Sequence, residues 1–268
     1  MAGLANSGEL GIMTYGSCLS ASVADRLIRN YPRFYRRVSS VQHMRIDQFT
    51  SSYLNKSTLP LLSTDFDLKP KPQHVSLIDN QLDDREIGRS LLYGLDRDNL
   101  GHPLDAINSK KVDLLLIDSF PELQFRISRH KETSKLIYFH PDHLTQPAEG
   151  FETIPGWISP SEAIKEFSCL IDSMRKENPR LVSIFINFPA NGRGRDDVTA
   201  RAESIQEASN KLKQQNRCGV IDLIDIRKDE FEPKNDPYHF NRSRYDQYAF
   251  MVHGLNHYIA SSNRDTEG

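Results

Sequence analysis

Three residues near the two ends of the chain have the types that nucleophilic acyl chemistry requires. Ser17 follows a short apolar segment and a glycine, and a helical pattern begins soon after it. A hydroxyl at such a turn lies beside unpaired backbone N–H groups, which stabilise developing negative charge. Near the other end of the chain, Asp236 precedes His239 by three residues. This pattern predicts a serine nucleophile, with His239 as the base that takes its proton and Asp236 as the carboxylate that orients the imidazole.

Each of these residues also has a purely structural interpretation. Ser17 suits the N-cap of a helix, where its Oγ only satisfies backbone donors. Cys18 is an alternative nucleophile because a helix N-terminus favours a thiolate, although a small packing residue is the simpler interpretation. Asp236 precedes a proline, which is common turn chemistry, and His239 would then be exposed without a role.

The segments between these residues alternate between strand and helix patterns. Short apolar runs predict strands at 12–15, 35–41, 112–118, 135–139, 181–187 and 220–224. Helical periodicity predicts helices at 21–30, 81–98, 159–177, 200–216 and 243–259. The alternation favours an α/β fold, a three-layer α/β/α domain on a flavodoxin-like parallel sheet of about five strands. Ligands bind at the carboxyl ends of such strands, where we expect Ser17, Asp118, Ser119 and Asn187.

We expect a single domain over residues 10–260. The segment 48–79 is rich in serine and proline and predicts a loop excursion over the surface. Loops of this length in a compact domain are typically functional, so a lid is one interpretation. The polar ends, 1–9 and 261–268, are predicted to be disordered. Ser159 and Glu162 predict a capping box at the start of the helix that follows them.

Composition narrows the class of protein further. The chain has 268 residues, 38% hydrophobic and 26% charged, and its net charge of −2 gives no global basic surface for nucleic acid. No window reaches the roughly 18 to 20 apolar residues that span a membrane. The N-terminal residues lack the basic start and apolar core of a signal peptide. The 3 cysteines are widely spaced without a CxxC pattern, so we expect no zinc site, no cofactor and a cytoplasmic protein.

Two polar clusters have weaker ligand-binding patterns. His140, Asp142 and His143 are metal-ligand types within a few positions, but nothing else clearly completes a coordination shell, so a polar loop is the favoured interpretation. Arg193 and Arg195 alternate with glycines and are able to hold a phosphate or a CoA-type acyl donor. A solvated loop is the more typical form of such a segment.

The chain resembles the SGNH (GDSL-like) hydrolase superfamily in Gly16-Ser17-Cys18-Leu19-Ser20, in the strand ends at Asp118 and Asn187, and in Asp236-Pro237-Tyr238-His239. Members place a nucleophilic serine just after the first strand and an Asp-x-x-His in the last loop. Gly-Ser-Cys in place of Gly-Asp-Ser is similar to a branch that includes uncharacterised bacterial families and proteins of polysaccharide biosynthesis. The resemblance implies the SGNH hydrolase fold and the triad Ser17, His239 and Asp236.

The sequence departs from this family at the oxyanion hole. Typical members carry a Gly-x-Asn-Asp block after the third strand, and its asparagine donates to the oxyanion. Here that place reads Ile117-Asp118-Ser119-Phe120, and a carboxylate beside an oxyanion is unfavourable unless it is protonated or turned away. The remaining candidates are Ser119, Asn187 and the backbone N–H groups of Ser17 and Cys18. The glycine of the family's second block is not identifiable, and the nearest region is 39–49.

The predicted function is that of a serine esterase or an O-acyltransferase. The substrate would be an ester of a small molecule or a carbohydrate, and a transferase would use an acyl donor such as acetyl-CoA. The alternative is a non-hydrolytic module of the same fold that binds CoA, a nucleotide or a sugar phosphate at the Ser17 turn. A third hypothesis is a flavodoxin-like regulatory domain, which accounts for Asp118 at a strand end but not for Asp236 and His239.

Overall fold

A computed structural model describes residues 9–55, 62, 68–82, 100–190, 195–215, 218–232 and 238–265. Its main sheet has five parallel strands in the order β2-β1-β3-β7-β8. The strands are β1 (Leu10–Gly16), β2 (Tyr35–Gln42), β3 (Leu114–Asp118), β7 (Val182–Ile186) and β8 (Gly219–Ile221). Every residue of β3 and β7 is buried, as expected for strands that helices cover on both faces. The predicted parallel sheet of about five strands is confirmed.

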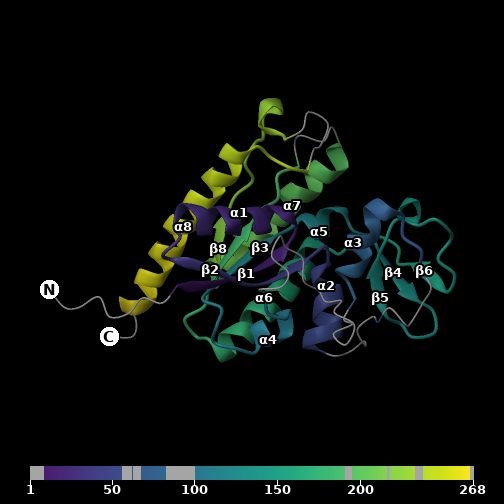
Figure 1. Ribbon diagram of the computed structural model, residues 1–268, viewed down its shortest axis with the longest axis horizontal. Helices are drawn as coiled ribbons and strands as arrows, with labels where there is room; N and C mark the ends of the chain where they lie inside the picture. The colour runs from purple at the N-terminus through teal and green to yellow at the C-terminus, as the bar shows by residue number, and fades with distance from the viewer. Residues whose placement is uncertain are drawn as a thin grey trace.

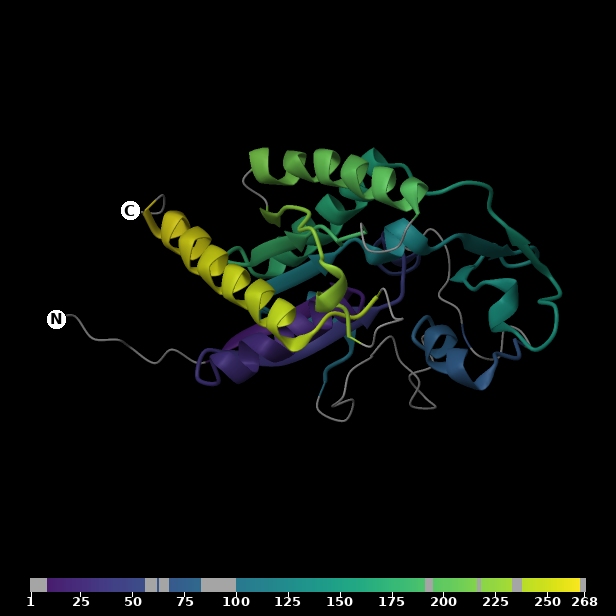
Figure 2. The ribbon, with the colours of Figure 1, turned by 90° about the horizontal axis from the view of Figure 1, so that it is seen from above.

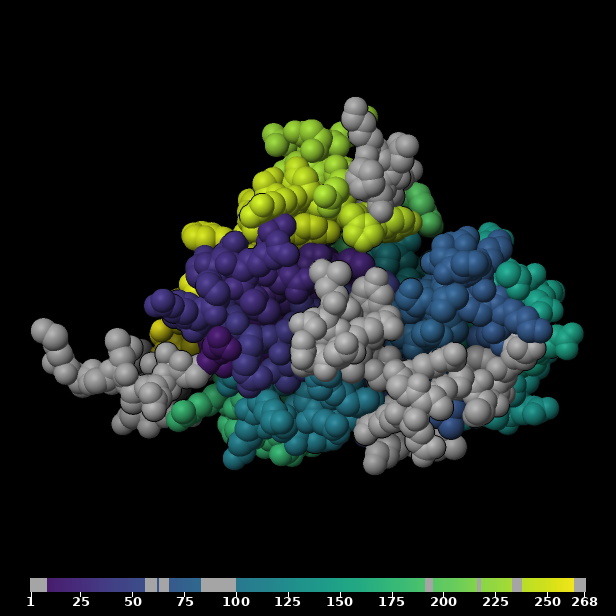
Figure 3. All heavy atoms as spheres, in the orientation of Figure 1, coloured from purple at the N-terminus to yellow at the C-terminus, as the bar shows by residue number. Residues whose placement is uncertain are grey.

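Helices cover both faces of this sheet (Figure 1). On one face, α1 (Cys18–Asn30) packs along α8 (Arg242–Asp265), so the two ends of the described chain lie side by side (Figure 3). On the other face, α6 (Pro160–Glu177) contacts α4 (Pro103–Ile107) and α7 (Asp196–Gln214). The three-layer α/β/α architecture is therefore confirmed. The predicted capping box is also present, because Ser159 Oγ accepts the Glu162 N–H at 3.2 Å and Glu162 accepts the Ser159 N–H at 3.2 Å.

The predicted strand 135–139 belongs to a second sheet. It forms β5 (Leu136–Tyr138), which joins β4 (Ile127–His130) and β6 (Phe151–Thr153) in a three-stranded antiparallel sheet of order β5-β4-β6. Figure 2 shows this small sheet at one end of the molecule, beyond the carboxyl ends of the main strands. It follows α5 (Phe120–Gln124) and precedes α6. A short apolar run shows that a strand forms but not which strand it will pair with.

The predicted excursion 48–79 is irregular only in part. Gln48 and Phe49 belong to α2 (Ile46–Phe49), and a π-helical turn, η1 (Thr50–Leu54), continues it. After residues 56–61 and 63–67, which lie outside the described residues, come η3 (Pro72–His74) and α3 (Val75–Asp79). The lid interpretation stays a prediction. The predicted helix 81–98 lies outside the described residues except for Gln81 and Leu82, which are not helical.

The predicted disordered ends differ from the structure at the C-terminus. Residues 1–8 and 266–268 lie outside the described residues, but α8 extends to Asp265, so 261–265 are helical. The described residues also contain two short 3-10 turns, η6 (Pro141–His143) and η8 (Lys228–Glu230). Apolar side chains between the three layers form one large core, and a smaller one (Ile78, Leu82 and Ile137) joins α3 to the small sheet.

Candidate active site

Strand register aligns the carboxyl ends of three neighbouring strands. Gly16 at the end of β1 pairs with Gln42 at the end of β2, and Tyr15 pairs with Ile117 of β3. The next residues along each strand therefore meet at one edge of the sheet. This places Ser17, His43 and Asp118 together, although up to a hundred residues separate them in the chain.

Ser17 lies at the N-cap of α1. Its backbone is extended at φ −131°, its Oγ accepts the Leu19 N–H at 3.1 Å, and its side chain is 4% exposed. The structural interpretation of Ser17 as a helix cap is thus realised. It does not exclude a nucleophile, because Oγ accepts through a lone pair and keeps its own proton for a base.

Asp118 occupies the backbone donors of the Ser17 turn. Its Oδ2 accepts the N–H of Ser17 at 2.8 Å and that of Ser20 at 3.0 Å, and its Oδ1 accepts the Phe120 N–H at 3.1 Å. Burial raises the pKa of Asp118, and these N–H donors oppose the rise. The carboxylate is therefore bound within the turn, and the Ser17 N–H is already used by it.

Gly16 permits this close approach. Its φ is +136°, and an added Cβ would lie 2.6 Å from the carboxyl carbon of Asp118. We predict that Gly16→Ala lowers the free energy of unfolding by about 2 to 3 kcal/mol through backbone strain and overpacking. Urea unfolding measures the change. Gly156→Ala is the matched control, since Gly156 has φ +83° and nothing within 4 Å of its added Cβ. Equal losses in both variants would show that Asp118 is not the cause.

The loop that carries His239 reaches the same sheet edge. The ring of Tyr238 packs edge-on against Phe120 with centroids 5.6 Å apart, and Phe120 is the first residue of α5, directly after Ser119. His239 is half-buried, and its backbone oxygen accepts the Glu232 N–H at 3.0 Å. Asp236 lies outside the described residues. The hydrogen bond from Ser17 Oγ to His239 and the role of Asp236 stay predictions.

His43 and Asn80 are at this edge although the sequence patterns did not single them out. His43 directly follows β2, and its N–H donates to Gly16 O at 3.0 Å with a left-handed φ of 59°. Its Nδ1 lies 3.3 Å from Nδ2 of Asn80, which is 1% exposed. Desolvation, followed by the neighbouring His239, lowers the pKa of His43 to about 4.

The sequence contained one signal for His43, a histidine just after the second strand, because histidine is enriched among residues with positive φ. Asn80 had no local signal, since only the packing of α3 brings it here.

Besides Ser17, the three other residues expected to serve the oxyanion lie in different settings. Cys18 is the first residue of α1, and its N–H has no acceptor among the described residues. Ser119 is buried and its Oγ accepts the Phe188 N–H at 3.1 Å, which leaves its own proton to donate. Asn187 donates from Nδ2 to Ser209 Oγ at 3.2 Å and to Ile221 O at 3.0 Å. Both amide protons of Asn187 are therefore used toward α7 and β8, and the structure does not bring them to Ser17.

The two polar clusters that resembled ligand sites in the sequence make contacts within their own segments. His140 Nδ1 lies 3.3 Å from Asp142 Oδ2, and His143 closes the η6 turn. Among the residues that the structure describes, no three His, Cys, Asp or Glu side chains gather to hold a metal ion. Arg195 pairs with Asp197 at 2.7 Å on the surface, and Arg193 lies outside the described residues.

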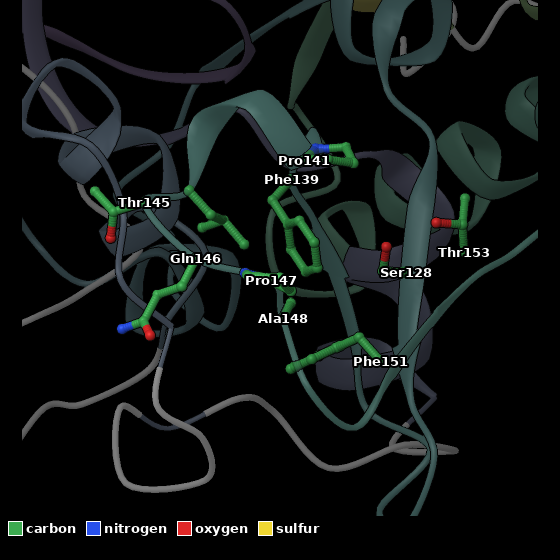
Figure 4. A pocket seen from close by; sticks show the side chains of 10 residues that line it. Ser128, Phe139, Pro141, Thr145, Gln146, Pro147, Ala148, Phe151 and Thr153 are labelled. Carbon is green, nitrogen blue, oxygen red and sulfur yellow. The ribbon is translucent and has the colours of Figure 1, made fainter.

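A cavity of about 420 Å³ lies on the small sheet and not at the Ser17 turn (Figure 4). Phe139 and Phe151 form its apolar wall, and Gln146 and Thr153 are among its polar lining residues. The residues that line it carry no charge and include none of those at the Ser17 turn. The opposite side of this sheet faces the site, since Tyr138 stacks on Phe125 with centroids 3.8 Å apart. The cavity is therefore separate from the sheet edge where Ser17, His43 and Asp118 meet.

Comparisons with known proteins find similarity in structure but not in sequence. No protein-family model and no curated protein matches the chain. A lipase, Lip_vut3 from a goat rumen metagenome, is similar over 91% of this chain and 96% of its own, with 10% identity and a TM-score of 0.44. A family 3 carbohydrate esterase from Talaromyces cellulolyticus is similar over 94% and 99%, with 13% identity and a TM-score of 0.42. A family 2 carbohydrate esterase with a carbohydrate-binding domain, from Corynascus thermopiles, is similar over 97% and 68%, with 10% identity and a TM-score of 0.48.

Among the helices of the described residues, none combines the length and the apolar character needed to cross a membrane.

Proposed function

We propose that this chain is a serine esterase of the SGNH hydrolase type that acts on an ester of a carbohydrate or another small molecule. The observation that carries the proposal is the meeting of two distant segments at one sheet edge. The Ser17 turn and the loop of His239 both reach the carboxyl end of β3, where Phe120 contacts Tyr238 and Asp118 binds the Ser17 N–H. Nucleophilic acyl chemistry needs a nucleophile and a base within reach of each other.

The proposed reaction has two halves. Ser17 Oγ attacks the ester carbonyl while His239 accepts the hydroxyl proton, and Asp236 orients the imidazole and stabilises its positive charge. The tetrahedral oxyanion collapses, the C–O bond to the alcohol breaks, and the leaving oxygen takes the proton from His239. Water then attacks the acyl-serine with His239 again as base, which releases the acid and restores Ser17. A sugar hydroxyl in place of water gives O-acylation by the same residues, with an acyl donor such as acetyl-CoA.

The binding-module alternative is less well supported at this turn. A phosphate of CoA, a nucleotide or a sugar would need the N–H groups at the start of α1. Those of Ser17 and Ser20 donate to the Asp118 carboxyl. A bound anion would therefore find these donors occupied, and the Asp118 carboxylate would repel it. Hydrolysis also requires no second substrate site, so we favour the esterase over the transferase.

Labelling with a fluorophosphonate tests the proposed nucleophile. We expect the wild-type protein to be labelled and Ser17→Ala to be unlabelled, because the probe traps an activated serine hydroxyl. Ser204→Ala is the matched control, since Ser204 is an exposed serine on α7, and it should be labelled like the wild type.

Absence of labelling in the wild type, or labelling that survives Ser17→Ala, would contradict the nucleophile. Thermal stabilisation by CoA, a nucleotide or a sugar phosphate, without hydrolysis of p-nitrophenyl acetate, would support the binding module instead.

A further inference from the structure

We propose that His43 donates a hydrogen bond from Nε2–H to the carbonyl oxygen of the ester that Ser17 attacks, and that Asn80 fixes the ring so that this nitrogen carries the proton. The proposal rests on the proposed esterase function. It names the donor for the oxyanion that the sequence left unassigned.

The need for such a donor follows from the hydrogen bonds already made at the site. Stabilising an oxyanion takes preorganised donors within about 3 Å of the oxygen. The Ser17 N–H donates to Asp118, and the amide of Asn187 donates to Ser209 and Ile221 O. The Cys18 N–H and the Ser119 hydroxyl are the candidates on the α1 and β3 side of the turn. A donor from the β2 side would complete the surroundings of the oxygen.

The backbone fixes His43 against the nucleophile turn. Two successive carbonyls of the turn accept hydrogen bonds from the end of β2, because the His43 N–H donates to Gly16 O at 3.0 Å and Gln42 Nε2 donates to Ser17 O at 3.4 Å. His43 is thus tied to the residue that precedes the nucleophile. Its ring also lies 6.3 Å, centroid to centroid, from Phe125. Preorganisation of this kind is what makes a donor effective in a transition state.

Asn80 determines which ring nitrogen carries the proton. An amide nitrogen only donates, so Nδ2 of Asn80 at 3.3 Å makes Nδ1 of His43 the acceptor. The neutral imidazole then has its single proton on Nε2. The Asn80→Asp variant below tests this tautomer.

The ring is also neutral where the proposed base must become charged. Burial, and then the neighbouring His239, lower the pKa of His43 to about 4, so it is uncharged near pH 7. A neutral imidazole is an effective donor to an oxyanion. A neutral His43 also places no second positive charge beside His239 when His239 takes the Ser17 proton. The two imidazoles therefore have separate roles, one as donor and one as base.

Two variants at position 43, with one at a remote histidine as the control, test the donor. We expect His43→Phe, which keeps a ring without a donor, to lower kcat for p-nitrophenyl acetate by about 10²- to 10³-fold with little change in KM. His43→Gln keeps an N–H donor and should stay within about tenfold of the wild type. His130→Phe is the control, because His130 lies at the end of β4 in an exposed turn with Thr133. Circular dichroism and urea unfolding confirm that each variant folds.

Asn80→Asp tests the tautomer with a readout that a structural role would not move. A carboxylate at position 80 accepts a proton from Nδ1, so the neutral ring loses the proton on Nε2 and regains it only when the ring is protonated. We expect the ratio of its kcat to the wild-type kcat to rise as the pH falls from about 9 to 6. Asn80→Ala should lower kcat with a ratio that is independent of pH.

The outcomes separate this inference from the proposed function. If the wild type does not hydrolyse esters or is not labelled at Ser17, the esterase proposal fails and this inference fails with it. If the wild type is active and His43→Phe is as active as His130→Phe, the donor role is wrong while the esterase stands. If the Asn80→Asp ratio does not change with pH, the assigned tautomer is wrong.

Discussion

Replacing His239 by alanine should lower the rate of ester hydrolysis by about 10⁴- to 10⁶-fold, as expected when the base of a serine triad is removed. A serine hydroxyl is a weak nucleophile unless a neighbouring group takes its proton as it attacks. Without His239, the residual rate would come only from binding and from the oxyanion donors. The measurement is kcat for p-nitrophenyl acetate, together with the rate of fluorophosphonate labelling.

The control for this prediction is the second imidazole at the site. His43 is a poor substitute for the base, because a group with a pKa of about 4 has little tendency to accept a proton near pH 7. We therefore expect His43 not to rescue His239→Ala, whereas added imidazole should restore part of the rate. Activity of His239→Ala within about tenfold of the wild type would assign the base to another residue.

The variant Asp236→Asn should hydrolyse p-nitrophenyl acetate about 10⁴-fold more slowly than the wild type if Asp236 orients the imidazole.

Glu122→Gln should make the protein more stable than the wild type at alkaline pH. Glu122 has no exposed surface, and its Oε1 accepts the Ile46 N–H at 2.9 Å. Its Oε2 has no hydrogen-bond partner among the described residues. Burial, with smaller contributions from Asp118 and Asp47, raises the pKa of Glu122 from 4.5 to about 8. The folded protein therefore holds this carboxyl in its neutral form near pH 7.

The sign of the effect follows from the protons bound in each state. Between about pH 4.5 and 8 the folded protein keeps the Glu122 proton and the unfolded chain has lost it, so this group's contribution to stability falls as the pH rises. The loss is about 1.4 kcal/mol per pH unit. A glutamine at this position accepts the same N–H and does not ionise. We expect Glu122→Gln to match the wild type within about 1 kcal/mol at pH 5 and to exceed it by on the order of 4 kcal/mol at pH 9.

Urea unfolding of both proteins from pH 5 to 9 gives this difference directly, because the contributions of the other groups cancel. Glu132→Gln is the matched control, since Glu132 is exposed, and its difference from the wild type should not vary with pH. A constant difference for Glu122→Gln would show that Glu122 is ionised in the folded protein at neutral pH.

The main sheet was predictable because its signals are local. An unbroken apolar run such as 114–117 is typical of a strand that is covered on both faces, and these residues form most of β3. The helix that follows Ser17 and the capping box of α6 depend on neighbouring residues in the same way. The small sheet was not predictable, because its strands β4, β5 and β6 are only three or four residues long and their sequences do not indicate that they pair with one another.

By itself the sequence determined the fold class, the position of Ser17 at the start of a helix, and the spacing that places Asp236 three residues before His239. The last two follow from residue types within a few positions of one another, and the fold class follows from the alternation of strand and helix patterns along the chain. Only the tertiary structure decided that the Asp118 carboxyl accepts the Ser17 N–H, that the Asn187 amide faces away from Ser17, and that His43 and Asn80 lie beside the Ser17 turn. The physical reason is that a hydrogen bond depends on which strand ends meet, and strand register is set by packing across the whole sheet.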